Sequence, residues 1–171
     1  MDSIASGNLN CCLEMVISDN PKAFGLKRAE ARNIKTYVAD KKIYGQELSK
    51  EILKLTENKV DLIVLAGFLS ILSPEFTNSF KNRIINIHPS LIPSFCGDKM
   101  YGLKVHEAAI GYGVKYSGCT VHFVDEGIDT GKIICQKIVP VYTEDTAESL
   151  QKRILAEEHM ALTEAIKTFC S

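Results

Sequence analysis

The chain carries almost no net charge, because 20 Lys and Arg face 21 Asp and Glu. Nucleic acids and anionic membranes attract proteins mainly through basic surfaces, so the composition makes no electrostatic case for either partner. No apolar run reaches the roughly 20 residues of a membrane-spanning helix. Residues 1–4 contain neither a basic stretch nor the apolar core of a signal peptide. We therefore expect a cytoplasmic protein with no nucleic-acid or membrane partner.

Paired cysteine motifs are also absent. None of the six cysteines forms a Cys-x-x-Cys pair, and no Cys/His cluster has zinc-finger spacing. We therefore expect reduced thiols and no metal, with Cys119 and Cys135 acting as small hydrophobic residues in predicted strands. There is also no Gly-x-Gly-x-x-Gly or Walker-type turn, which leaves a generic nucleotide-binding domain without support.

The pattern of elements predicts one α/β domain covering residues 1–171. Strands alternate with helices up to residue 93, which is typical of right-handed βαβ units around a mostly parallel sheet with helices on both faces. The apolar run at 61–67 fits a strand buried on both faces. Later strands at 116–124 and 132–141 suit an antiparallel pair. The other predicted elements are strands at 12–18, 34–38 and 84–88, helices at 23–32, 46–58, 104–110 and 147–169, and a short helix that begins at residues 73–75.

The stretch 84–93 (IINIHPSLIP) contains the most informative polar residues. Pro89 should end the strand near His88, and Asn86, two residues earlier, projects from the same face. Ligands of open α/β sheets bind at such strand ends. An imidazole can move a proton near neutral pH, and an amide can donate to a developing oxyanion. The alternative is a histidine held by backbone groups; the Asn-x-His-Pro spacing and Pro93 favour a site.

Two carboxylates stand out more weakly. Asp129 lies in an Ile-Asp-Thr-Gly loop between two predicted strands, where turn chemistry is the commonest role of Asp. Glu158 falls on the apolar stripe of the last helix, where a carboxylate costs free energy unless it is paired or faces a cleft. The alternative for Glu158 is an edge position that reaches water.

Four motifs in order carry a resemblance that runs from about Cys12 to the end of the chain. The sequence resembles the folate-dependent phosphoribosylglycinamide formyltransferases of purine synthesis. The motifs are residues 66–73 (AGFLSILS), 86–93 (NIHPSLIP), 117–124 (SGCTVHFV) and 128–131 (IDTG).

The resemblance implies formyl transfer from 10-formyltetrahydrofolate to the amine of glycinamide ribonucleotide, with Asn86, His88 and Asp129 as the catalytic trio. Asn86 and protonated His88 would stabilise the oxyanion. Asp129 would orient the imidazole and favour its cation, since a neighbouring negative charge does so. No metal is needed.

The resemblance also implies binding roles. Ser70 replaces an Arg that is common in relatives, and the match at Lys41 is loose. The implied folate contacts are Leu69, Ser70, Ile71, Leu72, Asn86, Asp125, Glu126, Gly127, Ile128 and Lys41, and the implied ribonucleotide contacts are Gly67, Pro89 and Glu158.

Members of this family begin with a strand and a Gly/Ser-rich turn that cradles the substrate phosphate at a helix N-terminus. The present sequence starts beyond both and also stops slightly early, so the resemblance implies an N-terminally incomplete domain. We expect unpaired strand edges and a weakened substrate anchor.

Two other functions fit the same motifs. A formyltetrahydrofolate hydrolase would use the same trio with water as the acceptor, and would release formate without an amine. A catalytically weak folate-binding fragment would bind folate without transfer. Monomer and homodimer both stay open.

Overall fold

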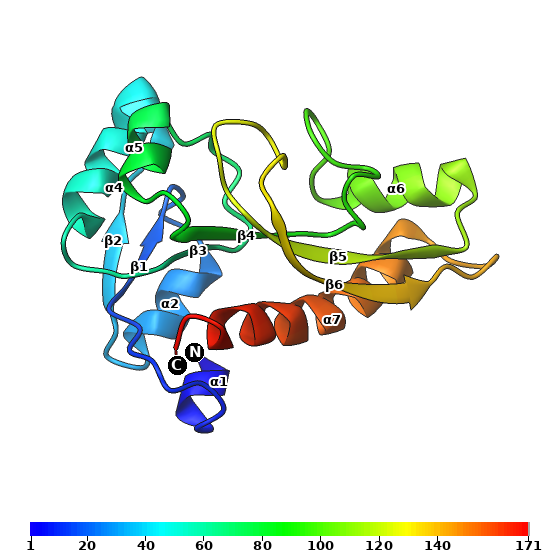
Figure 1. Ribbon diagram of the computed structural model, residues 1–171, viewed down its shortest axis with the longest axis horizontal. Coiled ribbons are helices and arrows are strands. Elements are labelled where there is room, and N and C mark those ends of the chain that lie inside the picture. Colours follow the sequence, from blue (N-terminus) through cyan, green and yellow to red (C-terminus); the bar gives the residue numbers. More distant parts are fainter. Residues whose placement is uncertain (171) are drawn as a thin grey trace.

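The computed structural model describes residues 1–170, and its strands form two sheets (Figure 1). The smaller sheet pairs two parallel strands, β1 (Met15–Ser18) and β2 (Lys35–Val38). The larger sheet has the order β3-β4-β5-β6, with β3 and β4 parallel and the remaining pairs antiparallel. Its strands are β3 (Ile63–Leu65), β4 (Ile84–His88), β5 (Tyr116–Phe123) and β6 (Ile133–Pro140).

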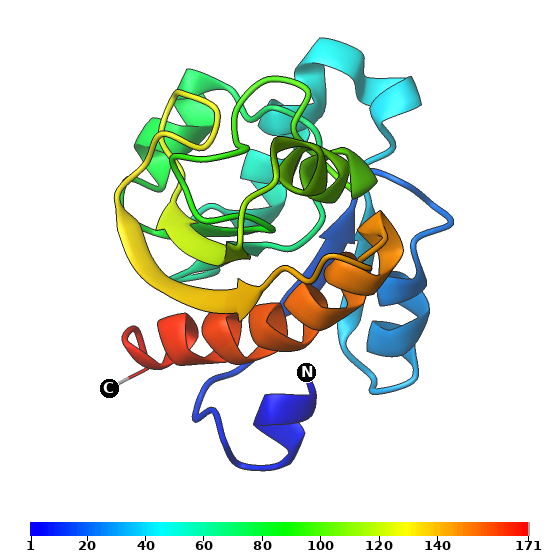
Figure 2. The same ribbon diagram turned by 90° about the vertical axis from the view of Figure 1, so that its right-hand side faces the viewer.

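Helices connect the strands and cover the sheet on both faces. The C-terminal helix α7 runs along β5 and β6, and its first turns approach α6, as the two perpendicular views show (Figures 1 and 2). None of the helices within residues 1–170 is long and apolar enough to cross a membrane. The helices are α1 (Asp2–Ala5), α2 (Phe24–Glu30), α3 (Lys41–Tyr44), the 3-10 turn η1 (Gly45–Glu47), α4 (Leu48–Thr56), α5 (Pro74–Ser79), α6 (Leu103–Tyr112) and α7 (Ala147–Lys167).

Two apolar cores lie on opposite faces of β4. Ile84 and Ile85 are adjacent and both fully buried, and alternate residues of a strand point to opposite faces. Ile85 joins the core that packs against α7, whereas Ile84 joins the core formed with α4 and α5. The strand that carries Asn86 and His88 at its C-terminal end is thereby packed on both faces.

The predicted α/β fold is confirmed in its main elements. The strand predicted at 84–88 is β4 with the same bounds, and β5 and β6 form the expected antiparallel pair. Helix α5 begins as expected, because the Ser73 side chain accepts a hydrogen bond from the Phe76 N–H and Pro74 occupies the first turn. Within residues 1–170, β1 pairs only with β2, and β3 pairs only with β4.

One prediction about a single element was wrong. The strand predicted at 61–67 is only three residues long and is not buried on both faces, because β3 pairs only with β4 among residues 1–170 and Val64 remains 37% exposed. The helix predicted at 46–58 is present as α4 but begins at Leu48, because residues 45–47 form the 3-10 turn η1.

All six cysteines are free. Cys119 is completely buried in β5, as predicted, and burial raises the pKa of its thiol to about 12. Cys135 is partly buried and packs against the same core.

Candidate active site

Asn86 and His88 lie at the C-terminal end of β4, between β3 and β5. Asn86 pairs with Leu65 on one side and with His122 on the other, while His88 lies opposite Thr120. His88 is only 5% exposed. A polar pair at this depth must find partners within the protein, and both residues do.

The loop between β5 and β6 brings Asp129 to His88. The Asp129 carboxylate oxygen Oδ2 lies 3.4 Å from His88 Nδ1, and it accepts a hydrogen bond of 3.0 Å from the Gly97 N–H. Asp129 has a positive φ of 58°, a conformation that Asp adopts more readily than most residues. The predicted meeting of Asn86, His88 and Asp129 is thus present in the structure; their catalytic roles stay a prediction.

Both ring nitrogens of His88 face acceptors. Nε2 lies 2.9 Å from the carbonyl oxygen of Phe95, and Nδ1 faces the Asp129 carboxylate. A neutral imidazole has only one N–H to donate, whereas the imidazolium has two. Both nitrogens of the His88 ring are thus in contact with oxygen acceptors.

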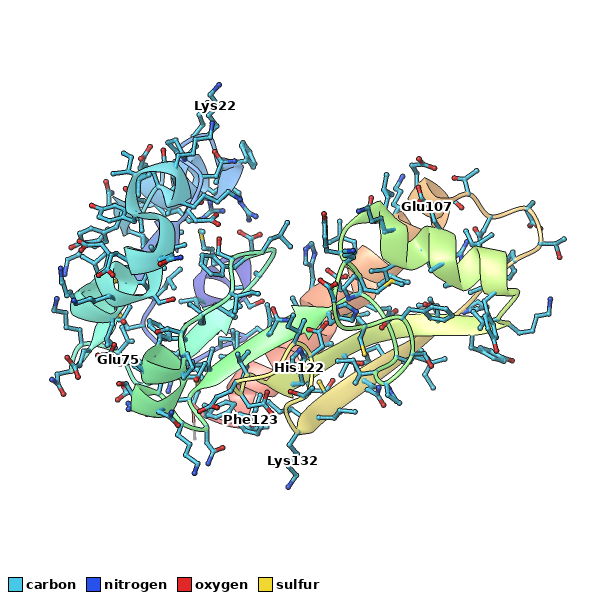
Figure 3. All side chains as sticks on the ribbon, turned by 90° about the horizontal axis from the view of Figure 1, so that it is seen from above. Lys22, Glu75, Glu107, His122, Phe123 and Lys132 are labelled. Carbon is cyan, nitrogen blue, oxygen red and sulfur yellow. The ribbon has the colours of Figure 1, made fainter. Side chains whose placement is uncertain are left out.

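His122 also belongs to the site, although no role was predicted for it from the sequence. Its Nδ1 lies 2.8 Å from the carbonyl oxygen of Phe123, so Nδ1 carries a proton. Its Nε2 lies 3.2 Å from the Asn86 amide nitrogen and 3.5 Å from Asp129 Oδ1. Figure 3 labels His122 and Phe123 at the end of β5 beside β4. His122 stood in the motif at 117–124, but only the register between β4 and β5 places it opposite Asn86.

The Asp129 carboxylate stays ionised despite its surroundings. Burial alone would raise its pKa, but the neighbouring His122, the hydrogen bond from the Gly97 N–H and the charge of His88 together outweigh burial and lower the pKa below its usual value. The site thus holds a negative charge against the imidazole of His88.

A network of hydrogen bonds holds the segment after His88 in place. The Thr120 hydroxyl donates to the Ser90 carbonyl oxygen at 2.7 Å and accepts from the Ile92 N–H at 3.1 Å. Gln136 donates to Thr120 Oγ1 and to the Ile92 carbonyl oxygen. Ser90 and Thr120 are both fully buried. These hydrogen bonds fix the turn that follows β4, next to the site.

The trio lies on the wall of a cavity of about 570 Å³. Leu69 and Ile71 line it with apolar side chains that are 62% and 75% exposed, so this wall offers apolar surface to a ligand. All the predicted site residues except Lys41 contribute to the lining, namely Gly67, Leu69, Ser70, Ile71, Leu72, Asn86, His88, Pro89, Asp125, Glu126, Gly127, Ile128, Asp129 and Glu158.

Lys41 lies outside the lining of this cavity. Its Nζ is 3.8 Å from Asp19 Oδ2, and the same carboxylate oxygen accepts a hydrogen bond of 2.6 Å from the Ser70 hydroxyl. Ser70 is therefore linked to Lys41 through Asp19. A folate contact of Lys41 stays a prediction.

Glu158 and His106 line the cavity from two helices. Glu158 is partly buried, and burial raises the pKa of its carboxyl. Two positions were considered for Glu158, one facing a cleft and one at an edge that reaches water. The structure has the first, since Glu158 lines the cavity.

His106 on α6 is 1% exposed and its Nδ1 has no hydrogen-bond partner within residues 1–170. Burial, and then the charge of His88, lower the pKa of His106. No sequence pattern distinguished His106 from an ordinary core residue.

Across residues 1–170, no group of three or more His, Cys, Asp or Glu side chains is arranged to hold a metal ion.

Two curated relatives resemble the chain over much of its length. It is 41% identical to the trifunctional purine biosynthetic protein adenosine-3 of Chironomus tentans over 176 aligned residues, which cover 100% of this chain and 12% of the relative. It is 47% identical to the chloroplastic phosphoribosylglycinamide formyltransferase of Vigna unguiculata, with 68% of this chain and 37% of the relative covered. The chain therefore spans much less than two thirds of either relative.

Solved structures share the fold. The glycinamide ribonucleotide transformylase 1 of Symbiobacterium toebii superposes with a TM-score of 0.91 at 40% identity, covering 99% of this chain and 79% of the other. A formyltetrahydrofolate deformylase of Pseudomonas syringae pv. tomato superposes with a TM-score of 0.87 at 29% identity, covering 97% and 54%.

A family model described as formyl transferase matches residues 1–166. That match includes the end of β4, the loop that carries Asp129 and the part of α7 that carries Glu158. The chain belongs to the formyl transferase family.

Proposed function

We propose that this chain transfers a formyl group from 10-formyltetrahydrofolate to the amine of glycinamide ribonucleotide, a step of purine biosynthesis. The observation that carries the proposal is the meeting of Asn86, His88 and Asp129 on the wall of the cavity. Both the Symbiobacterium toebii enzyme and the Vigna unguiculata relative are named for this substrate or reaction.

The cavity fits a folate on its apolar side. Its volume lies within the range of about 300–1,000 Å³ that is common for small-molecule sites. Leu69, Ile71 and Leu72 would pack against the flat pteridine, and the segment 125–128 would close over its edge. Gly67, Pro89 and Glu158 would line the ribonucleotide side.

The trio would act by stabilising charge. When the amine attacks the formyl carbon, negative charge develops on the formyl oxygen. The Asn86 amide has two N–H groups, one of which is committed to His122, so the second is free to donate to that oxygen. The imidazolium of His88 adds a positive charge in a buried setting, where such stabilisation is strongest. Asp129 keeps that imidazolium in place.

For His88 to donate a hydrogen bond to the formyl oxygen, one existing hydrogen bond of its ring must be replaced. Nε2–H is engaged with the Phe95 carbonyl oxygen, so binding of the formyl oxygen at Nε2 would replace this bond. The amine proton must finally reach the leaving nitrogen N10 of the folate. A carboxylate and an imidazole within 3.4 Å of each other form a relay suited to that transfer.

The test compares formyl transfer by the wild-type chain, by His88→Ala and by His159→Ala. His159 lies on the exposed side of α7, outside the cavity lining, and serves as the matched histidine control. We expect His88→Ala to lose at least about 10²-fold in kcat, and His159→Ala to retain wild-type activity. Equal rates in wild type and His88→Ala would refute the proposal.

The same assay without the amine separates the alternatives. Release of formate in the absence of ribonucleotide would favour a hydrolase, the activity named for the structurally similar Pseudomonas syringae protein. Binding of folate without transfer would favour a binding fragment. A cytoplasmic location and a monomeric or homodimeric state also stay predictions; the Vigna unguiculata relative is named as chloroplastic.

A further inference from the structure

The cavity is lined by many acidic side chains and by a single Lys or Arg, Lys99. All the lining residues fall within residues 1–170. The acidic ones are Asp98, Asp125, Asp129, Glu126 and Glu158. Both expected substrates are themselves anions, a phosphate ester and a folate that carries glutamate. Such ligands need a positive group in a pocket that otherwise repels them.

None of the ion pairs formed within residues 1–170 includes Lys99, so its charge has no ion-pair partner among these residues. Several of the neighbouring acids are engaged elsewhere. Asp125 accepts hydrogen bonds from Thr130 and the Gly127 N–H, and Glu126 accepts one from Asn78.

Lys99 is carried on a segment that is tied to the catalytic trio. We call residues 95–102 the strap; it links β4 to α6 and rises beside the β5–β6 loop (Figures 1 and 2). At one end of the strap the Phe95 carbonyl oxygen faces His88, and the Gly97 N–H donates to Asp129. The other end leads into α6. Lys99 thus lies on a segment anchored to the trio, and it lines the same cavity.

The backbone at Lys99 is strained. Its φ is +62°, a left-handed conformation that disfavours any residue with a Cβ, whereas glycine adopts it freely. Lysine at such a position suggests that its side chain serves a purpose that glycine would not. Lys104, two residues beyond the strap, stacks on the Tyr101 ring at 4.8 Å and does not line the cavity.

We propose that Lys99 recognises the anionic group of one substrate, either the phosphate of the ribonucleotide or the glutamate carboxylates of the folate. This inference rests on the proposed function. It makes Lys99 a specificity residue, because it would act on substrate affinity and not on the rate of the chemical step.

The experiment measures KM for both substrates with wild type, Lys99→Gly, Lys99→Arg and Lys104→Ala. Lys99→Gly removes the charge while relieving the strained φ, so it should fold at least as well as wild type, which urea unfolding checks. We expect Lys99→Gly to raise KM for one substrate about ten- to hundredfold, with kcat within threefold of wild type. Lys99→Arg should retain most of the affinity, and Lys104→Ala should match wild type.

Truncated ligands identify the anion. If Lys99 holds the phosphate, Lys99→Gly and wild type should bind the dephosphorylated ribonucleoside equally well. If it holds the carboxylates, the two proteins should bind a formylated pteroate without glutamate equally well. Unchanged KM values for both substrates, or a fall in kcat alone, would overturn the inference. Absence of transfer in wild type would instead show that the proposed function has failed, and the inference with it.

Discussion

Replacement of Asp129 by Asn tests the electrostatic part of the proposed mechanism. Asn has nearly the same shape as Asp and tolerates the positive φ of 58° at this position. Its side-chain oxygen can still accept the hydrogen bond from the Gly97 N–H. The variant therefore removes the negative charge beside His88 and leaves the loop in place.

The size of the effect follows from the geometry. Asp129 Oδ2 lies 3.4 Å from His88 Nδ1, and the two side chains are 11% and 6% exposed. Unit charges about 4 Å apart attract by about 4 kcal/mol at the effective dielectric constant of about 20 that suits protein sites. A loss of that size would slow the reaction about 10³-fold. Because the Gly97 bond persists, we expect a fall in kcat of about 10²- to 10³-fold.

The assay is steady-state formyl transfer with both substrates saturating, with the exposed Asp61→Asn as the matched control. Asp61→Asn should retain wild-type kcat. A kcat of Asp129→Asn within threefold of wild type, in a protein that still requires His88, would refute the reasoning that the carboxylate supports the imidazolium.

Stability against pH gives a second measurement on the same variant. The folded pKa of Asp129 is lowered, so its carboxylate stabilises the fold above the unfolded value of 3.8, and this contribution disappears as the pH falls through the folded pKa. Asp129→Asn should therefore lower the free energy of unfolding at neutral pH and flatten its decline in acid. If the free energy of unfolding of Asp129→Asn fell in acid as steeply as that of the wild type, this would contradict the lowered pKa.

Three further predictions concern other contacts. His122→Gln should lower kcat about ten- to hundredfold, because it removes the nitrogen that holds the Asn86 amide, and its effect should not add fully to that of Asp129→Asn, since the ring lies 3.5 Å from Asp129 Oδ1. Asp145→Asn should cost about 1–2 kcal/mol at neutral pH, a loss that shrinks in acid because the Arg153 guanidinium holds the pKa of Asp145 below its usual range. Ile154→Ala should lower the free energy of unfolding in urea by about 2–5 kcal/mol, because the side chain is fully buried.

Each of the three has an outcome that would contradict it. Full additivity of His122→Gln and Asp129→Asn would mean that the two side chains act separately. An Asp145→Asn deficit that stays constant down to pH 2 would rule out the charge pair as its source. Replacement of the exposed Met160 by Ala is the control for Ile154→Ala, and equal losses in the two would show that α7 does not pack as described.

Elements defined by local chemistry were predictable from the sequence. Pro89 removes a backbone donor, so β4 had to end near His88, and the Ser73-Pro74 pair marks the start of α5. The burial of β3 was not predictable in this way. An apolar run shows what a strand is able to bury. Its actual exposure depends on whether neighbouring strands cover it, and in the described part of the chain β3 pairs with β4 alone.

The same distinction applies to the site. The sequence by itself determined that Asn86 and His88 share one face at a strand end, because side chains alternate along a strand. It could not determine that Asp129 reaches His88, that His122 joins them, or that Lys99 lines the cavity whereas Lys41 does not. These facts depend on strand register and loop closure between residues far apart in the chain. Charges and hydrogen bonds act over a few ångströms, so only the tertiary structure decides which of these groups meet.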